Sequence, residues 1–189
     1  MAEFGWNNSR EQQVARVRGA ARASNKDWGT IVTWTYSNFT GSPYIEPAPQ
    51  LYSDMVFAYN NGAKYAVVFD YPKLATAKLG ILTQEHLDAI KNFSNYVAKN
   101  SPSNADYKNV KTAYVLPTDY GFGFRNPVDC VWGLWGGDNQ TQKIYNDVNS
   151  LIQQKSANFD VVCDYPELLS DAKGHYDTLI YWNGTRINL

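Results

Sequence analysis

Residues 64–72 read KYAVVFDYP, and this stretch decides the fold class of the chain. Lys64–Phe69 is a nearly continuous apolar run, which is typical of a strand in a parallel sheet that is covered on both faces. Asp70 and Tyr71 follow where such a strand ends. A similar sequence, ANFDVVCDYPEL, occupies residues 157–168. Because the likeness does not extend into the flanking segments, we interpret it as a shared way of leaving a strand rather than as a duplication.

Amphipathic helical patterns lie on both sides of this strand, and a second strand precedes it. Helices are expected at 10–23, 50–60 and 83–99, where apolar residues recur at helical spacing. Thr83 is a suitable N-cap for the last of them. A strand rich in β-branched and aromatic residues is expected at 30–36. The residues expected to face inward from the second and third helices are Leu51, Met55, Ala58, Leu87, Ile90, Phe93 and Val97.

The second half of the chain repeats this alternation of strands and helices. A helix is expected at about 140–155, and strands are expected at 110–116, 158–163 and 177–182. Helices between strands imply a parallel sheet with right-handed crossovers. The polar, proline-containing stretch 101–104 follows a finished helix, so we place a candidate domain boundary there.

The composition excludes several classes of partner. The 189 residues include 17 Lys plus Arg and 18 Asp plus Glu, a formal net charge of −1, so no basic field attracts nucleic acid or anionic lipid. No segment approaches the roughly 20 consecutive apolar residues of a membrane span. We therefore expect a soluble protein with neither nucleic acid nor a membrane among its partners. The localisation stays unknown, although sequons hint at a secreted or cell-surface parent: Asn7, Asn38, Asn92, Asn139 and Asn183.

The sequence shows no signature of a metal or cofactor. Cys130 and Cys163 are far apart, as are His86 and His175, so none of them has the spacing of a metal site. Whether the two cysteines pair depends on geometry that the sequence does not contain. The chain has neither a Walker sequence nor a G-x-G-x-x-G, so a phosphate cradle for a nucleotide or flavin is missing. We expect no cofactor and no metal.

Polar and aromatic residues follow the expected strands, and parallel α/β sheets bind their ligands at that edge. Carboxylates beside aromatic rings suit glycoside hydrolysis, because one carboxyl protonates the leaving oxygen while a second attacks or activates water. The candidate catalytic residues are three carboxylates: Glu3, Glu46 and Asp70. The candidate substrate-binding residues are Trp34, Tyr36, Asn38, Tyr71 and Tyr120. For each of these residues, core packing or turn capping is the alternative role.

Several stretches together resemble a known family. They are residues 3–6 (EFGW), 14–23 (VARVRGAARA), 28–36 (WGTIVTWTY), 51–72 and 114–127. With its elements in this order, the chain resembles the C-terminal part of a (β/α)8-barrel glycoside hydrolase, as in family 42 β-galactosidases, followed by a flavodoxin-like domain. The resemblance implies an α/β fold in which 1–104 forms the last β/α units of a TIM-type barrel and 105–189 a flavodoxin-like parallel sheet. A single doubly wound parallel sheet with helices on both faces is the alternative.

The resemblance implies a carbohydrate-active protein or fragment with a carbohydrate ligand, but it supplies no catalytic pair. Such enzymes carry a nucleophilic Glu at the seventh strand, whereas the corresponding strand here has Trp34 and no Glu. We therefore expect a glycoside hydrolase-like chain that is not catalytically complete alone. A two- or three-stranded arc cannot close into a barrel and would expose an apolar sheet edge. The alternative is a noncatalytic ligand-binding or oligomerisation module that assembles into a homo-oligomer.

Overall fold

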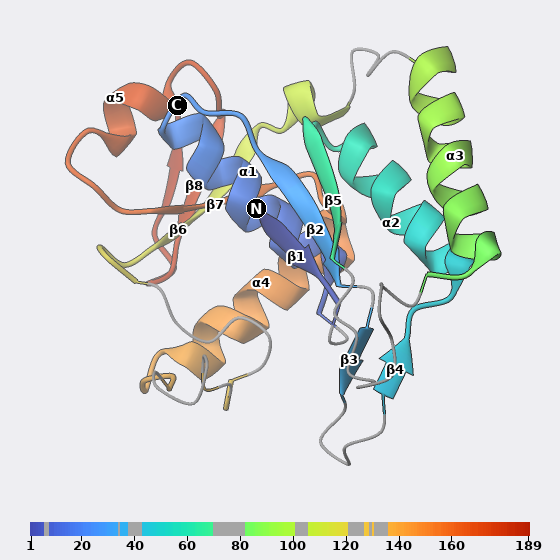
Figure 1. Cartoon of the computed structure of the whole chain (residues 1–189). Coiled ribbons are helices and arrows are strands. Elements are labelled where there is room, and N and C mark those ends of the chain that lie inside the picture. The colour runs from blue at the N-terminus through green and yellow to red at the C-terminus, as the bar shows by residue number, and fades with distance from the viewer. Residues whose placement is uncertain are drawn as a thin grey trace. The chain divides into compact units, whose positions relative to one another are not determined.

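The computed structural model describes residues 1–5, 8–33, 35–37, 43–69, 82–100, 106–120, 127–128, 130 and 136–189; for 35–37, 43–44, 106 and 108 it describes the backbone alone. The chain is α/β, with parallel-rich sheets and helices between the strands (Figure 1). It divides into two compact units. The first contains Met1–Arg10 and Asp27–Ala105, and the second contains Glu11–Lys26 and Asp106–Leu189.

The first unit is built on a three-stranded parallel sheet. Its strands are β1 (Ala2–Phe4), β2 (Gly29–Thr33) and β5 (Tyr65–Phe69), in the order β1-β2-β5. A separate antiparallel hairpin pairs β3 (Thr35–Ser37) with β4 (Pro43–Ile45). The segment predicted as one strand, 30–36, is therefore divided between the sheet and the hairpin. Trp34, at the division, lies outside the described residues.

Helix α2 (Ala48–Asn60) covers one face of this sheet. Its buried residues include Leu51, Met55 and Ala58, as expected. The rings of Phe4 and Phe57 lie 6.2 Å apart, which places α2 on the sheet face that carries Phe4. Residues alternate between the two faces of a strand, so Glu3 belongs to the opposite face.

Helix α3 (Gln84–Lys99) runs beside α2 and begins directly after Thr83, as predicted (Figure 1). The expectation that Leu87 is buried is wrong, since its side chain is 47% exposed. The residues that α3 buries are His86 and Ala89. The predicted inward residues Ile90, Phe93 and Val97 are half-buried, and the ring of Phe93 lies 6.2 Å from that of Tyr59 in α2.

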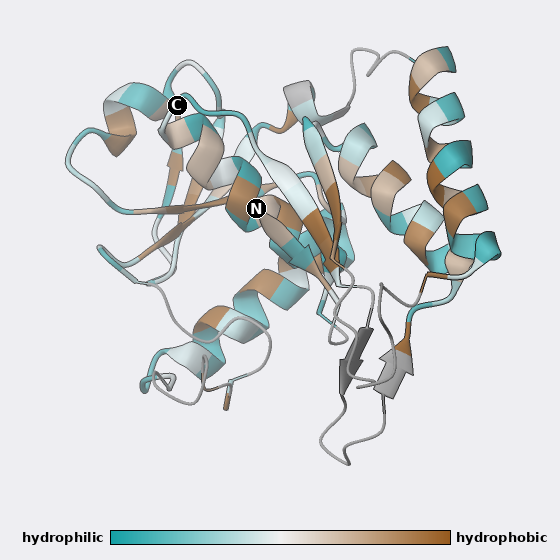
Figure 2. Ribbon diagram, in the orientation of Figure 1, coloured by the Kyte–Doolittle hydropathy of each residue, from teal (hydrophilic) through white to brown (hydrophobic). Residues whose placement is uncertain are grey.

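Strand β5 is present as predicted, but the expectation that both of its faces are covered is wrong. Tyr65, Val67 and Phe69 are 54%, 44% and 45% exposed. They lie on the sheet face opposite α2, and β5 is the end strand of its sheet in the part of the chain that is described. Figure 2 shows the hydrophobic character of β5 and of the neighbouring end of β2.

The second unit contains a four-stranded sheet in the order β7-β6-β8-β9. The strands are β6 (Thr112–Leu116), β7 (Asp160–Cys163), β8 (Thr178–Tyr181) and β9 (Arg186–Asn188). The first three are parallel, and β9 runs antiparallel to β8. The helices are α1 (Arg10–Ala23, of which all but Arg10 belongs to this unit), α4 (Thr141–Lys155) and α5 (Leu168–Ala172), and η1 (Asp106–Asn109) is a short 3-10 turn.

Both faces of this second sheet are covered. Tyr114 and Leu116 of β6 pack with Ala15 of α1 and with Ile144 and Val148 of α4. Ala113 and Val115, which alternate with them, pack on the other face with a cluster that includes α5. All five residues of β6 are consequently buried, which is the arrangement of a central strand in a doubly wound sheet.

Buried polar contacts fasten α1 within the second unit. Arg18 Nε and Arg22 Nη1 each lie 2.7 Å from an oxygen of Asp160, and the Tyr176 hydroxyl donates to the same carboxylate at 2.9 Å. A Cβ at Gly19 would lie 2.2 Å from the carbonyl oxygen of Val161, so only glycine allows this approach of helix to strand. Burial lowers the pKa of Arg18, although Asp160 opposes the shift. Arg18 is 1% exposed, so α1 packs through a charged residue as well as through its apolar ones.

Candidate functional site

Three ionisable side chains meet in the first unit between the end of β4 and the start of α1. Glu46 follows β4, Arg10 is the first residue of α1, and Asp54 lies on the inner side of α2. Arg10 Nη2 lies 2.7 Å from Asp54 Oδ2 and 3.4 Å from Glu46 Oε1. Arg10 Nε also donates to both oxygens of Asp54, at 3.2 and 3.1 Å. Arg10 therefore joins two carboxyl groups that are both almost completely buried.

Glu46 is held in its protonated form at neutral pH. Glu46 is only 1% exposed. This burial, together with the neighbouring Asp54, raises the pKa of the Glu46 carboxyl from 4.5 to about 8, although Arg10 acts in the opposite direction. Glu46 Oε2 has no hydrogen-bond partner among the described residues. A buried oxygen without a partner costs less free energy in a neutral carboxyl than in a charged carboxylate, so the protonated form is favoured here. The charge of Arg10 is then matched mainly by Asp54.

The backbone of Glu46 is fixed by α3. The carbonyl oxygen of Glu46 lies 2.9 Å from Nε2 of His86, and Nδ1 of that ring lies 2.5 Å from the Thr83 hydroxyl. His86, which sequence reasoning left without a role, thus links the start of α3 to Glu46, two residues before α2. The Glu46 side chain has little freedom to move toward a ligand.

Glu3 has the opposite environment. It is exposed on β1, on the sheet face away from α2, and Thr33 Oγ1 donates to its Oε1 at 3.5 Å. The register of the sheet puts Glu3 level with Ile31 and Val67. Glu3 is therefore a carboxylate on a face where the neighbouring strand positions are apolar.

The structure explains the residue types at Glu3, Phe4 and Gly5 in the sequence EFGW. Phe4 is completely buried, whereas Glu3 points away from the core. Gly5 has a φ of +149°, and a Cβ there would lie 2.8 Å from Cβ of Thr33. Glycine thus lets the chain leave β1 close to Thr33, the residue that bonds Glu3.

The other predicted site residues are not brought to this place in the described structure. Asp70, Tyr71, Trp34 and Asn38 lie outside the described residues, and for Tyr36 only the backbone in β3 is described. Their predicted roles stay predictions. Arg10 and Asp54 are the charged residues that sequence reasoning missed. Asp54 did leave a signal, since it sits among Leu51, Met55 and Ala58 on the predicted inner face of its helix, where a carboxylate needs a partner.

Tyr120 belongs to the second unit, where it is 8% exposed. Its hydroxyl donates to Asp138 Oδ1 at 3.0 Å and lies 2.9 Å from Thr141 Oγ1. Burial and the hydrogen bond to Asp138 raise the pKa of Tyr120. Its predicted role in sugar binding stays a prediction, and in the structure the ring packs in the core of this unit.

The N-terminus of α4 carries its own anion. Asp138 Oδ1 accepts hydrogen bonds from the backbone N–H groups of Gln140 and Thr141, at 2.9 and 3.1 Å. Partial burial would raise the pKa of Asp138, but these hydrogen bonds outweigh it and lower the pKa. Helix N-termini bind phosphate through such N–H groups, so the carboxylate already occupies the place that a phosphate would take.

Metal sites and membrane spans were sought among the described residues. Within them, no three His, Cys, Asp or Glu side chains gather as metal ligands would. No helix in these parts of the chain has the length and apolar character needed to cross a bilayer. Cys130 and Cys163 are both free thiols, and burial raises the pKa of Cys163.

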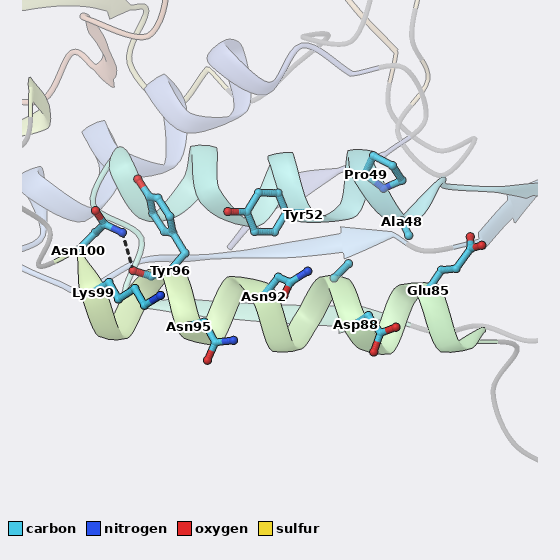
Figure 3. Close-up of a pocket in the computed structure, with 11 residues that line it drawn as sticks. Ala48, Pro49, Tyr52, Glu85, Asp88, Asn92, Asn95, Tyr96, Lys99 and Asn100 are labelled. Atoms are coloured by element: carbon cyan, nitrogen blue, oxygen red, sulfur yellow. Dashed lines mark hydrogen bonds between the residues drawn. The ribbon is translucent and has the colours of Figure 1, made fainter.

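A groove of about 700 Å³ lies between α2 and α3 (Figure 3). Tyr52 from α2 and Tyr96 from α3 line it, together with polar residues of α3 such as Asp88 and Asn92. The Tyr96 hydroxyl donates to Asn60 Oδ1 at 3.1 Å, so it ties the two helices together. None of the predicted site residues lines this groove, which is a hollow between the helices rather than at the strand ends.

Comparison of the chain with family models, with characterised proteins and with solved structures finds no match. A functional assignment therefore depends on the residues of the chain itself.

Proposed function

We propose that the chain is a carbohydrate-active, glycoside hydrolase-like protein or fragment that supplies one wall of a sugar site on the face of β1-β2-β5 opposite α2. The observation that carries the proposal is Glu3, an exposed carboxylate on this face, with exposed Tyr65 and Phe69 two strands away. In a partial barrel, the face of the strands opposite the outer helices is the interior face. The face of β1-β2-β5 opposite α2 corresponds to it, and it carries apolar side chains and a carboxylate.

The strand order supports this interpretation. β1, β2 and β5 are parallel and follow one another in the sheet in their order along the chain. Consecutive strands of a (β/α)8 barrel have this relation, with helices outside and the residues between them facing the interior. On this interpretation α2 is an outer helix, and Glu3, Val67 and Phe69 face the barrel interior.

The spacing of these residues suits a sugar. Neighbouring strands lie about 4.8 Å apart, so Glu3 and the β5 side chains are separated by roughly 10 Å, the width of one or two sugar rings. Aromatic rings offer flat apolar surfaces to the sugar, and a carboxylate accepts hydrogen bonds from its hydroxyl groups. This combination favours a carbohydrate over a purely apolar ligand.

The three predicted carboxylates take different roles in the proposal. Glu3 is the carboxylate that contacts the sugar. Glu46 is too deeply buried for that, so we assign it as a positioning residue that acts through Arg10 on the start of α1. Asp70, which follows Phe69 in the sequence, stays the candidate for a second carboxylate. The chain alone is expected to bind sugars and to lack a complete catalytic pair.

The experiment is a titration of the whole chain with a panel of galactose-, glucose- and mannose-containing oligosaccharides, in which NMR measures binding. We expect binding of at least one of them, and a loss of about tenfold in affinity on Glu3→Gln, because a charge-assisted hydrogen bond contributes about 1.5–3 kcal/mol. Glu85→Gln, a change at an exposed residue of α3, is the matched control and should leave the affinity unchanged. Binding of no member at millimolar concentration, or equal affinity in Glu3→Gln, would contradict the proposal.

A hydrolysis assay with nitrophenyl glycosides separates sugar binding from catalysis. Any turnover by the chain should fall at least about a hundredfold on Glu3→Gln, as expected for a carboxylate that acts on the reacting sugar. If the Glu3→Gln variant hydrolyses at the rate of the unmodified chain, Glu3 is not a catalytic residue.

A further inference from the structure

The groove between α2 and α3 is hollow because small residues lie where the two helices face each other. Ala48 at the start of α2 and Ala89 on α3 are both 7% exposed, and Pro49 lines the groove beside Ala48. Side chains this short leave space between two packed helices that longer ones would fill. The resulting volume of about 700 Å³ lies in the range of ligand-binding pockets.

Two tyrosines form walls of this groove. Tyr52 belongs to α2 and Tyr96 to α3, and both are half-buried. The ring of Tyr96 packs edge-on against that of Tyr59 at 6.2 Å, and its hydroxyl donates to Asn60, so this ring is held in place without a ligand. The Tyr52 hydroxyl has no hydrogen-bond partner among the described residues. The groove therefore offers a fixed aromatic ring and a hydroxyl that is available to a ligand.

Neutral amide groups line the middle of the groove. Asn92 and Asn95 are exposed on α3, and neither side chain has a hydrogen-bond partner in the described parts of the chain. Figure 3 shows Asn92 and Tyr52 across from each other, midway along the two helices. Each amide donates through its nitrogen and accepts through its oxygen. A ligand with hydroxyl groups suits these amides, because each hydroxyl also both donates and accepts.

The charged residues of the groove lie toward its two ends. Glu85 and Asp88 are near the start of α3, and Lys99 is at its end. Asp88 already accepts a hydrogen bond from Gln84 Nε2 at 3.0 Å. The carboxylates outnumber the ammonium group among the described lining residues, so phosphate and other anions are disfavoured. The centre of the groove is neutral, which favours an uncharged ligand.

The groove is long enough for a chain of sugar rings. Its lining residues on α3 extend from Glu85 to Lys99, which corresponds to about 21 Å along the helix axis. A single sugar ring would contact only a part of this length. An oligosaccharide of several rings would contact the tyrosines and the amides together.

We propose that the groove between α2 and α3 binds a neutral oligosaccharide, whose rings contact Tyr52 and Tyr96 and whose hydroxyl groups bond Asn92 and Asn95. Tyrosine rings present flat apolar faces to the C–H groups of a sugar, and the amides bond its hydroxyl groups. This site goes beyond the proposed function, because it shares no residue with the face of β1-β2-β5 that carries Glu3. The chain then holds a sugar chain at a second place, between helices.

The first test is an NMR titration of the whole chain with glucose and mannose oligosaccharides of one to six rings. The chain is produced without N-glycosylation, because Asn92 begins a sequon. We expect the side-chain amide signals of Asn92 and Asn95 to shift, with an affinity that rises with the number of rings. No shift of these signals at millimolar concentration, or equal affinity for one ring and for six, would overturn the proposal. So would a lysine-rich peptide that binds there more tightly than every oligosaccharide.

The second test uses variants, with the affinity measured at the Asn95 signal. Tyr52→Ala should lower the affinity about tenfold, because buried aromatic contacts dominate binding. Tyr145→Ala is the matched control and should leave it unchanged, since Tyr145 is also a half-buried helical tyrosine but lies on α4 in the second unit. Far-UV circular dichroism shows that both variants are folded.

An exposed position gives a variant that does not disturb packing. Asn92→Ala should lower the affinity about fivefold through the loss of hydrogen bonds to the sugar. Ser94→Ala, at an exposed residue of the same helix that does not line the groove, should leave the affinity unchanged.

The titration also separates this site from the proposed sugar site on the sheet. Binding at the sheet face is measured at the backbone signals of β1 and β5, and Glu3→Gln should weaken it without changing the affinity at Asn95. An affinity at Asn95 that is the same in Tyr52→Ala, Asn92→Ala and the unmodified chain would overturn the groove site and leave the proposed function in place. Binding at Asn95 without binding at β1 and β5 would support the groove site and contradict the proposed function.

Discussion

Strands β5 and β6 are both largely apolar, but their surroundings are opposite. β5 reads YAVVF and β6 reads TAYVL, and both continue a largely apolar run. β6 lies between β7 and β8, with α4 against one face and the cluster around α5 against the other. Among the described residues β5 is the end strand of its sheet, and α2 covers one of its faces. The comparison shows that an apolar run predicts a strand but does not predict which elements cover that strand.

The largest effect that tests this comparison is the removal of one aromatic ring from each strand. Tyr114→Ala on β6 should destabilise the chain by about 3–5 kcal/mol, because it empties a fully packed site, whereas Tyr65→Ala on β5 should cost less than about 1 kcal/mol. Urea unfolding followed by circular dichroism measures both. Equal losses would mean that the Tyr65 side chain is covered in solution.

A somewhat smaller effect is expected from the ion pairs of the two regions. Arg18→Ala in the second unit removes one of two cations from the buried carboxylate of Asp160, and it should cost about 3 kcal/mol. Lys64→Ala, next to β5, removes an exposed ion pair with Asp27 and should leave the stability nearly unchanged. Amide hydrogen exchange of the β6 and β2 backbones reports the two units separately. Similar losses of stability in the two variants would show that the burial of an ion pair does not decide how much it stabilises the chain.

A third effect depends on pH and concerns Glu46 in the first unit, which also contains β5. The folded pKa of Glu46 lies above its unfolded value, so its contribution to stability is complete below about pH 4.5 and is lost as the pH rises toward about 8. Between these values the stability of the first unit should fall by up to about 1.4 kcal/mol per pH unit. Glu46→Gln, which is always neutral, should flatten this dependence, and Glu85→Gln should not. Parallel curves for the unmodified chain and Glu46→Gln would show that Glu46 is ionised in the folded state.

The smallest effect is expected at Leu87. Its position in the apolar pattern of α3 had indicated a core residue, yet it is exposed, so Leu87→Gln should change the free energy of unfolding by less than about 0.5 kcal/mol. A loss above about 2 kcal/mol would mean that this side of α3 is covered in solution.

The features that the sequence predicted correctly depend on local interactions. The bounds of α1 and α4 follow from the spacing of apolar residues, and α3 starts at its predicted cap, Thr83. The features that it did not predict depend on distant residues. Whether β5 is an end strand depends on which strands are available to pair with it. Arg18 reads as a surface residue until Asp160, far along the chain, is placed beside it.

The candidate site divides in the same way. Glu46 was selected because it follows a strand, but its burial and its proton depend on Arg10 and Asp54, which come from two other elements. Glu3 was selected from the EFGW sequence, and its exposure on the sheet face follows from the alternation of β1 with Phe4 inward. A carboxylate at a strand end can thus be found in a sequence, whereas its ionisation state requires the packed neighbours.

The proton on Glu46 also has a calorimetric consequence. The formal net charge of −1 counts every carboxyl as ionised, so the folded chain at neutral pH carries one proton more than this count at that position. Unfolding exposes Glu46 to water and releases the proton to the buffer. The heat of unfolding must then depend on the ionisation enthalpy of the buffer, so that phosphate and Tris at the same pH give different values for one and the same transition.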